Sequence, residues 1–108
     1  MEWVVKYLPE AEKDIDKLDG SPRKMVFKAI EKVRENPKSQ TEGGYGKPLG
    51  NKGGNNLTGL FKIKLRSLGL RVVYRLEEIP PENIMRIIVV SVREDNEVYD
   101  LAAERIKK

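Results

Sequence analysis

The sequence predicts an α+β domain, with an N-terminal strand and helical hairpin followed by a mostly antiparallel twisted sheet and a C-terminal helix. Apolar residues recur at helical spacing within residues 9–36, they alternate with polar residues in the second half of the chain, and helical spacing returns after residue 93. The 108 residues match the usual size of one domain, and no internal repeat divides them. We therefore expect residues 1–108 to form a single domain.

The N-terminal third predicts the strand and the two helices. Residues 3–7 are mostly β-branched and aromatic, which is typical of a strand. Pro9 suits the first turn of a helix that extends to residue 18, and Ser21 is a suitable N-cap for a second helix that ends at residue 36. Because the link between them is short, the two helices are expected to pack antiparallel.

Residues 43–59 predict a long, irregular and mobile loop. They contain seven of the nine glycines, together with Pro48 and three asparagines. Neither the G-x-x-x-x-G-K-S/T pattern nor the G-x-G-x-x-G pattern occurs here, so these glycines do not indicate a nucleotide-binding loop.

Residues 60–76 predict a β-hairpin with one cationic face. Apolar and basic residues alternate strictly from Phe61 to Arg66, which is the pattern of a half-buried strand. After a tight turn at residues 67–70, the chain returns with Arg71, Val73 and Arg75 on one face. If the hairpin pairs Arg66 with Arg71, five cations share one face, namely Lys62, Lys64, Arg66, Arg71 and Arg75.

In that register Lys64 lies opposite Val73, and Lys62 lies opposite Arg75. Like charges that face each other across strands are destabilising, by a few tenths to about 1 kcal/mol per pair. A sheet with only a structural role would interleave acidic or neutral side chains, so the pattern favours a face that binds phosphate.

The charge of the wider segment supports this interpretation. Residues 43–76 contain seven basic residues and no acidic one, although the formal net charge of the whole chain is only +4. Such segregation favours a polyanionic partner, and nucleic acid is the first candidate. The basic residues that we expect to bind RNA or the ribosome are Lys47, Lys52, Arg66 and Arg75.

The C-terminal third predicts a turn, a central strand and a helix. Residues 77–83 contain two prolines and form the turn, and residues 84–92 are almost continuously apolar, as in a strand covered on both faces. Arg93 stands where this strand ends. Asp95 or Asn96 caps the last helix, whose packing face is formed by Val98, Leu101, Ala102 and Ile106.

The missing residue types exclude several chemistries. Without histidine or cysteine, the chain cannot form a Ser-His-Asp triad, a histidine pair for RNA cleavage, a disulfide, or a zinc site with imidazole or thiolate ligands. The lack of acids in residues 43–76 disfavours a Mg²⁺ site, so no metal or cofactor is expected. No apolar run is long enough to span a membrane, and residues 1–3 do not resemble the start of a secretory signal, so we expect a cytoplasmic protein.

Lysine, arginine and tyrosine can still cleave RNA by attack of the neighbouring 2′-hydroxyl. Guanidinium and ammonium groups stabilise the charged phosphorane. A lysine acts as a base only if its pKa falls below the usual value of about 10.4, and repulsion from Lys62 and Arg66 would lower the pKa of Lys64 in this way. A tyrosine can stack on a base or donate to a phosphate.

Two segments resemble one family. Residues 60–74, Leu-Phe-Lys-Ile-Lys-Leu-Arg-Ser-Leu-Gly-Leu-Arg-Val-Val-Tyr, resemble the central hairpin of RelE-type bacterial toxins. Residues 93–99, Arg-Glu-Asp-Asn-Glu-Val-Tyr, resemble the C-terminal signature of those toxins, and the order of elements agrees along nearly the whole chain. The resemblance implies a RelE-like fold and a ribosome-dependent mRNA endoribonuclease, the toxin of a type II toxin–antitoxin pair, which cuts mRNA in the ribosomal A site by 2′-hydroxyl attack without a metal.

The resemblance also implies residue roles and partners. Lys62 and Lys64 match the two catalytic lysines, and we assign proton transfer to Lys64. Arg71 matches the arginine that stabilises phosphate charge, Arg93 the arginine that supports the scissile phosphate or the leaving group, and Tyr99 the tyrosine that stacks with or orients the mRNA base. The implied partners are a RelB-like cognate antitoxin, the ribosome and mRNA, and operator DNA through the toxin–antitoxin complex.

Some features depart from the founding members, and alternatives stay open. The segment 43–59 looks longer, residues 49–51 offer no arginine where those members carry one, and Val92 and Asp95 replace basic residues. A ParE-like inhibitor of DNA gyrase would share the fold, and a nucleic-acid-binding module without catalysis would share the charge. For single residues, Arg71 could pair with Glu77 or Glu78, Arg93 with Glu97, and Tyr99 could be a core aromatic.

Overall fold

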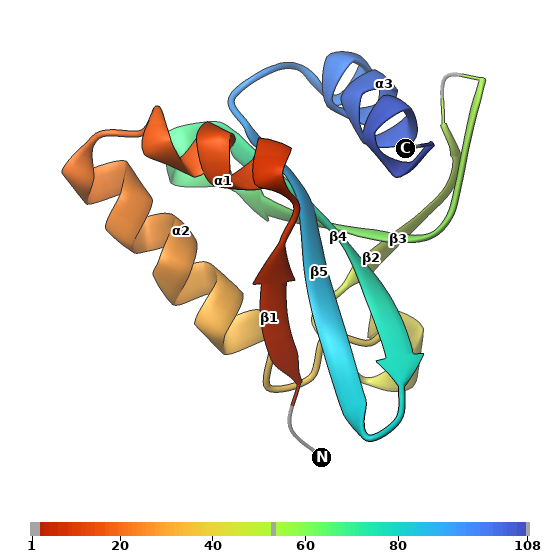
Figure 1. The fold of residues 1–108 in the computed structure, drawn as a ribbon. Helices are drawn as coiled ribbons and strands as arrows, with labels where there is room; N and C mark the ends of the chain where they lie inside the picture. Colours follow the sequence, from red (N-terminus) through yellow and green to blue (C-terminus); the bar gives the residue numbers. More distant parts are fainter. Residues whose placement is uncertain (1–2, 53, 108) are drawn as a thin grey trace.

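In the computed structural model, which describes residues 3–52 and 54–107, helices pack on a five-stranded sheet (Figure 1). The strands are β1 (Val4–Tyr7), β2 (Lys47–Lys52), β3 (Asn55–Leu65), β4 (Leu70–Ile79) and β5 (Glu82–Ser91). The helices are α1 (Pro9–Asp16), α2 (Gly20–Val33) and α3 (Asp95–Ile106), with short 3-10 turns at Gln40–Glu42 and Arg66–Leu68. Two predictions fall partly outside the described residues. Residues 1–2 belong to the segment that does not resemble a secretory signal, and residue 53 belongs to the predicted loop.

The sheet has the order β1-β5-β4-β3-β2 and is antiparallel except where β1 runs parallel to β5. This confirms the predicted α+β class. As predicted, β5 is an interior strand, because it lies between β1 and β4 and its residues 84–90 are buried apart from the half-buried Arg86.

The sheet separates two apolar clusters. Val72 and Tyr74 of β4 belong to the cluster that contains Ala11 and Ile15 of α1, whereas Val73 belongs to the cluster under α3. Neighbouring residues of a strand point to opposite faces, so α1 and α2 cover one face and α3 covers the other. Figure 1 shows α1 and α2 diverging from their link rather than lying side by side, so the expected antiparallel packing is not seen; both helices pack on the sheet instead.

The prediction that the whole of residues 43–59 is an irregular loop is wrong, because only residues 43–46 and the short link between β2 and β3 lie outside the strands. This segment contains β2 and the start of β3, which form an antiparallel hairpin, so four strands rather than three follow the helices. Positive φ angles at Gly50 (63°), Gly54 (82°) and Gly59 (89°) mark the irregular positions, and the register shifts between Pro48 and Gly50. These interruptions hide the alternation of apolar and polar residues that would identify strands in the sequence. The two strands nevertheless bury Leu49 and Leu57 in the cluster under α3.

The register of the central hairpin also differs from the predicted one. A 3-10 turn over residues 66–68 and Gly69, with φ 63°, connects the strands, so pairing begins at Leu65 and Leu70. Lys64 therefore lies opposite Arg71 and Lys62 opposite Val73. The shift of two residues keeps each strand residue on its predicted face, but Arg66 belongs to the turn and not to that face.

Two boundaries in the C-terminal third differ by a few residues. The strands extend further than predicted, and only Pro80 and Pro81 separate β4 from β5. The N-cap of α3 is Glu94, and Asp95 is the first helical residue. No helix in the described part of the chain is both long and apolar enough to cross a membrane.

Candidate active site

A buried lysine lies between the sheet and the start of α3. The side chain of Lys62 on β3 is only 7% exposed, and its Nζ donates to the hydroxyl of Tyr99 at 2.8 Å. The same Nζ lies 3.4 Å from Oδ2 of Asp95 and 5.4 Å from the centre of the Tyr99 ring. A buried ammonium is stable only with such partners, so Tyr99 and Asp95 fix the position of this charge.

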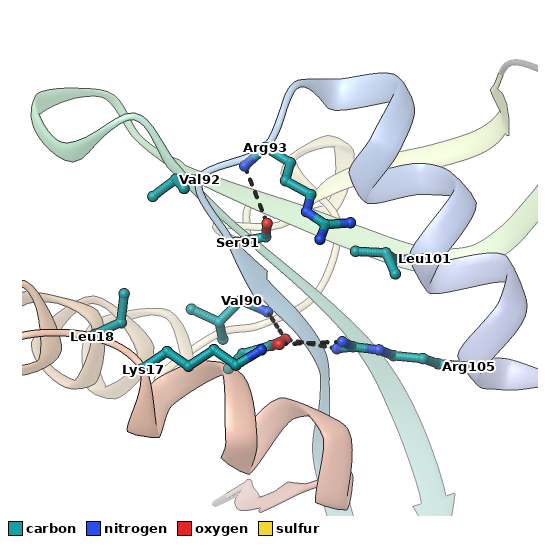
Figure 2. Close-up of a pocket in the computed structure, with 9 residues that line it drawn as sticks. Lys17, Leu18, Val90, Ser91, Val92, Arg93, Leu101 and Arg105 are labelled. Carbon is teal, nitrogen blue, oxygen red and sulfur yellow. Dashed lines mark hydrogen bonds and ion pairs between the residues drawn. The ribbon is translucent and has the colours of Figure 1, made fainter.

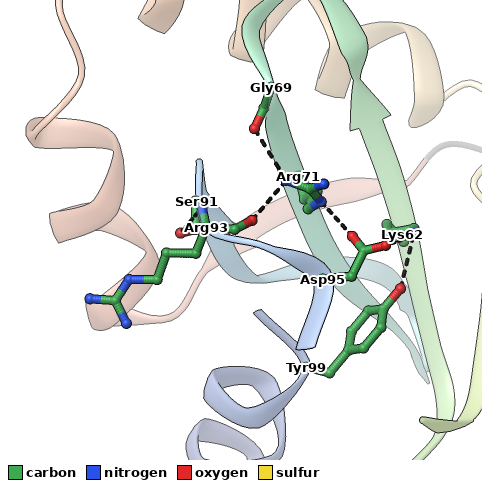
Figure 3. Close-up of polar contacts among 7 residues, drawn as sticks. All are labelled: Lys62, Gly69, Arg71, Ser91, Arg93, Asp95 and Tyr99. Atoms are coloured by element: carbon green, nitrogen blue, oxygen red, sulfur yellow. Dashed lines mark hydrogen bonds and ion pairs between the residues drawn. The ribbon is translucent and has the colours of Figure 1, made fainter. Parts of the chain in front are cut away.

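Arg71 reaches the same carboxylate from the next strand. Its Nε donates to Oδ1 of Asp95, and its side chain is 11% exposed. Its Nη1 donates to the backbone carbonyl of Arg93 at 2.7 Å and to that of Gly69 at 3.4 Å (Figure 3). One carboxylate therefore joins two cations that come from neighbouring strands.

Asp95 is the central residue of this cluster, which comprises Lys62, Arg71, Asp95 and Tyr99. Burial raises the pKa of its carboxyl, but the hydrogen bond from Arg71 and the charges of Lys62 and Arg71 outweigh burial and lower the pKa from its ordinary value. From the sequence alone, Asp95 is only a candidate cap and a departure from a basic position. Its spacing of four from Tyr99, which places both on one helix face, is the signal that could have found it.

Arg93 does not join the cluster through its side chain. Its backbone carbonyl accepts from Arg71, but Figure 3 shows the guanidinium pointing away, 58% exposed, with Nε 3.9 Å from Glu97. The side chain lies instead at a pocket of about 290 Å³ between α1, the end of β5 and α3 (Figure 2). Asp14 and Arg105 form an ion pair at 2.7 Å in the same pocket.

The other predicted basic residues lie outside the cluster. Lys64 and Arg66 are exposed. On β2, Lys47 is exposed and pairs with Lys62 of β3, whereas Lys52 is half-buried. Arg75 donates to Glu77 at 2.8 Å, so its charge is already partnered.

Glu77 on β4 binds two arginines, Arg75 on the same strand and Arg86 on β5. It accepts from Arg86 at 2.9 Å as well as from Arg75. The hydrogen bond from Arg86 is the main cause of a lowered pKa for Glu77, which burial opposes and Arg75 reinforces. The pairing of Arg71 with Glu77 or Glu78 that the sequence left open is therefore not formed, because Asp95 binds Arg71 instead.

Comparison with known proteins decides the family. The chain is 31% identical over 109 residues to the mRNA interferase toxin RelE of Escherichia coli K12, a match that covers 98% of this chain and 99% of the relative. The chain belongs to the RelE toxin family. No family model matches it.

Solved structures of the RelE family have the same fold. A mutant of E. coli RelE in the free state matches with a TM-score of 0.72 and 29% identity, over 98% of this chain and 99% of that one. A mutant of E. coli RelE in complex with a peptide of the antitoxin, RelBc, matches with a TM-score of 0.65 and 28% identity, over 97% and 98% of the two chains.

Proposed function

We propose that this chain is a ribosome-dependent mRNA endoribonuclease and the cytoplasmic toxin of a type II toxin–antitoxin pair. The observation that carries the proposal is the convergence of Lys62, Arg71 and Tyr99 at one place between the sheet and α3. Two cations with fixed positions suit a reaction whose transition state carries extra charge on phosphate. Membership of the RelE family, in which a relative is named an mRNA interferase toxin, supports the same function.

In the proposed reaction, the 2′ oxygen bonds to phosphorus and the bond to the 5′ oxygen breaks, without a metal. Lys64 is exposed and lies opposite Arg71 on the same face, so it can reach solvent-accessible RNA. We assign to it the removal of the proton from the attacking 2′-hydroxyl, and the departing 5′ oxygen takes a proton from the resulting ammonium or from water. The guanidinium of Arg71 stabilises the phosphorane. Arg93 is exposed, so its side chain can turn to the leaving group without loss of packing.

Lys62 and Tyr99 have less access to solvent than Lys64. Lys62 supplies a fixed positive charge behind the phosphate, and Tyr99 holds that charge in place through its hydroxyl. We assign contact with the mRNA base to the ring of Tyr99, which is 6% exposed in the free protein and must be uncovered when RNA binds. We assign contact with the RNA or ribosome backbone to Lys47, Lys52, Arg66 and Arg75.

The proposed inhibitor is a RelB-like antitoxin. The complex of E. coli RelE with an antitoxin peptide supports this assignment, and the seven basic residues of segment 43–76 favour an antitoxin with acidic character. We further propose that the toxin–antitoxin complex binds its own operator DNA.

Primer extension on an mRNA in a purified translation system, with and without ribosomes, tests the function. Wild type should cut within codons only when ribosomes are present, and Arg71→Ala and Lys64→Ala should abolish the cuts. Arg34→Ala, which removes a half-buried arginine at the C-cap of α2, far in sequence from the cluster, is the control and should cut like wild type. Intact mRNA with wild type would contradict the proposal and make inhibition of DNA gyrase the next assay.

A further inference from the structure

We propose that Asp95 occupies the phosphate site of the free protein and is displaced by the RNA phosphodiester, so that this residue limits the affinity of the site. The inference rests on the proposed function in taking Lys62 and Arg71 as groups that bind phosphate. It adds a residue to which neither the family relationship nor the sequence pattern gives a role in binding RNA.

The contacts of Asp95 are those of a bound anion. Its two oxygens are divided between two cations, with Oδ2 3.4 Å from Nζ of Lys62 and Oδ1 accepting from Nε of Arg71. A phosphodiester also presents two anionic oxygens on one atom, and guanidinium and ammonium groups bind both kinds of anion through the same donors. The site is therefore already shaped for two anionic oxygens and filled by a residue of the chain.

The exposure of the three side chains shows how the exchange can occur. Lys62 and Arg71 are 7% and 11% exposed, whereas Asp95 is 39% exposed and lies on the solvent side of the cluster. Residues 92–94, which precede Asp95, are exposed as well. The carboxylate can therefore turn toward water while the two cations stay in the sheet.

Asp95 and a phosphate cannot both bind Lys62 and Arg71 with the full electrostatic attraction that either anion has alone. Two anions a few ångströms apart in a partly buried site repel each other by about as much as each is attracted to one cation. RNA must displace Asp95 to bind Arg71 and Lys62, and the cost of that displacement weakens RNA binding.

The test is binding of a fluorescein-labelled RNA hexanucleotide with 2′-O-methyl groups, which cannot undergo 2′-hydroxyl attack, measured by anisotropy at several salt concentrations. Asp95→Asn should bind roughly tenfold more tightly at low salt and show a slope of log affinity against log salt that is steeper by about 0.7. Asp95→Ser, which suits the start of a helix, should change both quantities in the same direction.

Glu104→Gln is the matched control, because it removes one negative charge from an exposed position of the same helix. It should change the affinity by less than about twofold. Equal effects of Asp95→Asn and Glu104→Gln would show a net-charge effect and overturn the inference, and so would unchanged or weaker binding by the Asp95 variants.

The assay separates this inference from the proposed function. It needs neither ribosomes nor cleavage, so tighter binding by Asp95→Asn would support the inference even if primer extension found no cut. Conversely, ribosome-dependent cleavage by wild type with unchanged binding by Asp95→Asn would support the function and reject the role of Asp95.

Discussion

The ammonium of Lys62 donates to the hydroxyl of Tyr99 across 2.8 Å, and this contact ties β3 to α3. The two residues are 37 positions apart, yet both are almost fully buried. A charge on the face of the sheet that α3 covers is compatible with the apolar cluster only because the helix brings its acceptor. The contact thus links the stability of α3 on the sheet to the geometry of the cluster.

Tyr99→Phe removes that acceptor and leaves the ring in place. We expect the free energy of unfolding to fall by about 1–2 kcal/mol, because a buried donor loses a partner. Urea denaturation measures the change. Tyr45→Phe is the control, since Tyr45 is exposed, and it should stay within about 0.5 kcal/mol of wild type. Equal values for the two variants would show that the hydroxyl of Tyr99 adds nothing.

Asp14→Ala should destabilise the protein by roughly 3 kcal/mol, because it leaves the guanidinium of Arg105, whose side chain is only 13% exposed, without its carboxylate. Asp14 also accepts from the backbone N–H of Val90 at 3.0 Å, while Arg105 donates to the carbonyl of Ile88 at 2.9 Å, so the pair joins α1, β5 and α3. Chemical denaturation provides the measurement.

The control for that experiment is Glu31→Gln, which breaks the exposed pair with Arg34 and should cost less than about 0.5 kcal/mol. If Asp14→Ala costs no more than this control, the buried pair does not hold the helices to the sheet.

Glu77 predicts a specific dependence of stability on pH. Its pKa is lowered, chiefly by the hydrogen bond from Arg86, so the folded-state value lies below the ordinary value of 4.5. The contribution of Glu77 to the free energy of unfolding is therefore complete above about pH 4.5 and is lost as the pH falls through the folded-state pKa. The difference in unfolding free energy between wild type and Glu77→Gln should be largest near neutral pH and shrink below about pH 4.

Arg86→Met provides the control for this pH series. In that background Glu77 loses Arg86 and keeps Arg75 as a partner, so Glu77→Gln should produce a smaller difference near neutral pH. A difference that does not change between pH 7 and about pH 3 would contradict the assignment.

Gly46→Ala should destabilise the protein by about 1–3 kcal/mol, because a β-carbon there would overlap the hydroxyl of Tyr74 and the ring of Phe61. That hydroxyl donates to the carbonyl of Pro37 at 2.8 Å and cannot move without losing the bond. Gly20→Ala, where a β-carbon meets no neighbouring atom, is the control and should be neutral or slightly stabilising. Thermal unfolding of the two variants compares them directly.

Arg71→Lys tests whether the site needs a guanidinium or only a charge. A lysine cannot contact both Asp95 and the carbonyl of Arg93 in the same geometry, so we expect the cleavage rate to fall by roughly tenfold or more. Toxin binding to ribosomes should change much less. A rate close to that of wild type would show that charge alone is sufficient.

The elements with an uninterrupted period could be predicted from the sequence. The apolar run of β5, the alternation of residues 61–65 and the helical spacing of α1, α2 and α3 each follow one rule, and the structure confirms them. The hairpin of β2 and β3 could not be predicted, because glycines with positive φ and a register shift break its alternation.

The candidate site could be predicted only in part. The sequence points to Lys62, Arg71 and Tyr99, and the structure brings them together. The burial of Lys62 depends on where α3 lies, which no local pattern specifies. The position of Asp95 between the cations and the outward direction of Arg93 depend likewise on how the chain turns after β5.

The pairing of β1 with β5 determines when the sheet can be completed during synthesis. Val4 lies beside Ile84 and Tyr7 beside Ile87, so the first strand has no neighbour in the sheet until most of the chain has left the ribosome. Contacts between such distant segments form slowly, because a long loop must close first. The nascent chain therefore carries β1, α1 and α2 with their apolar sides uncovered until β5 arrives, and these segments are available to chaperones or other binding proteins before the cluster around Asp95 exists.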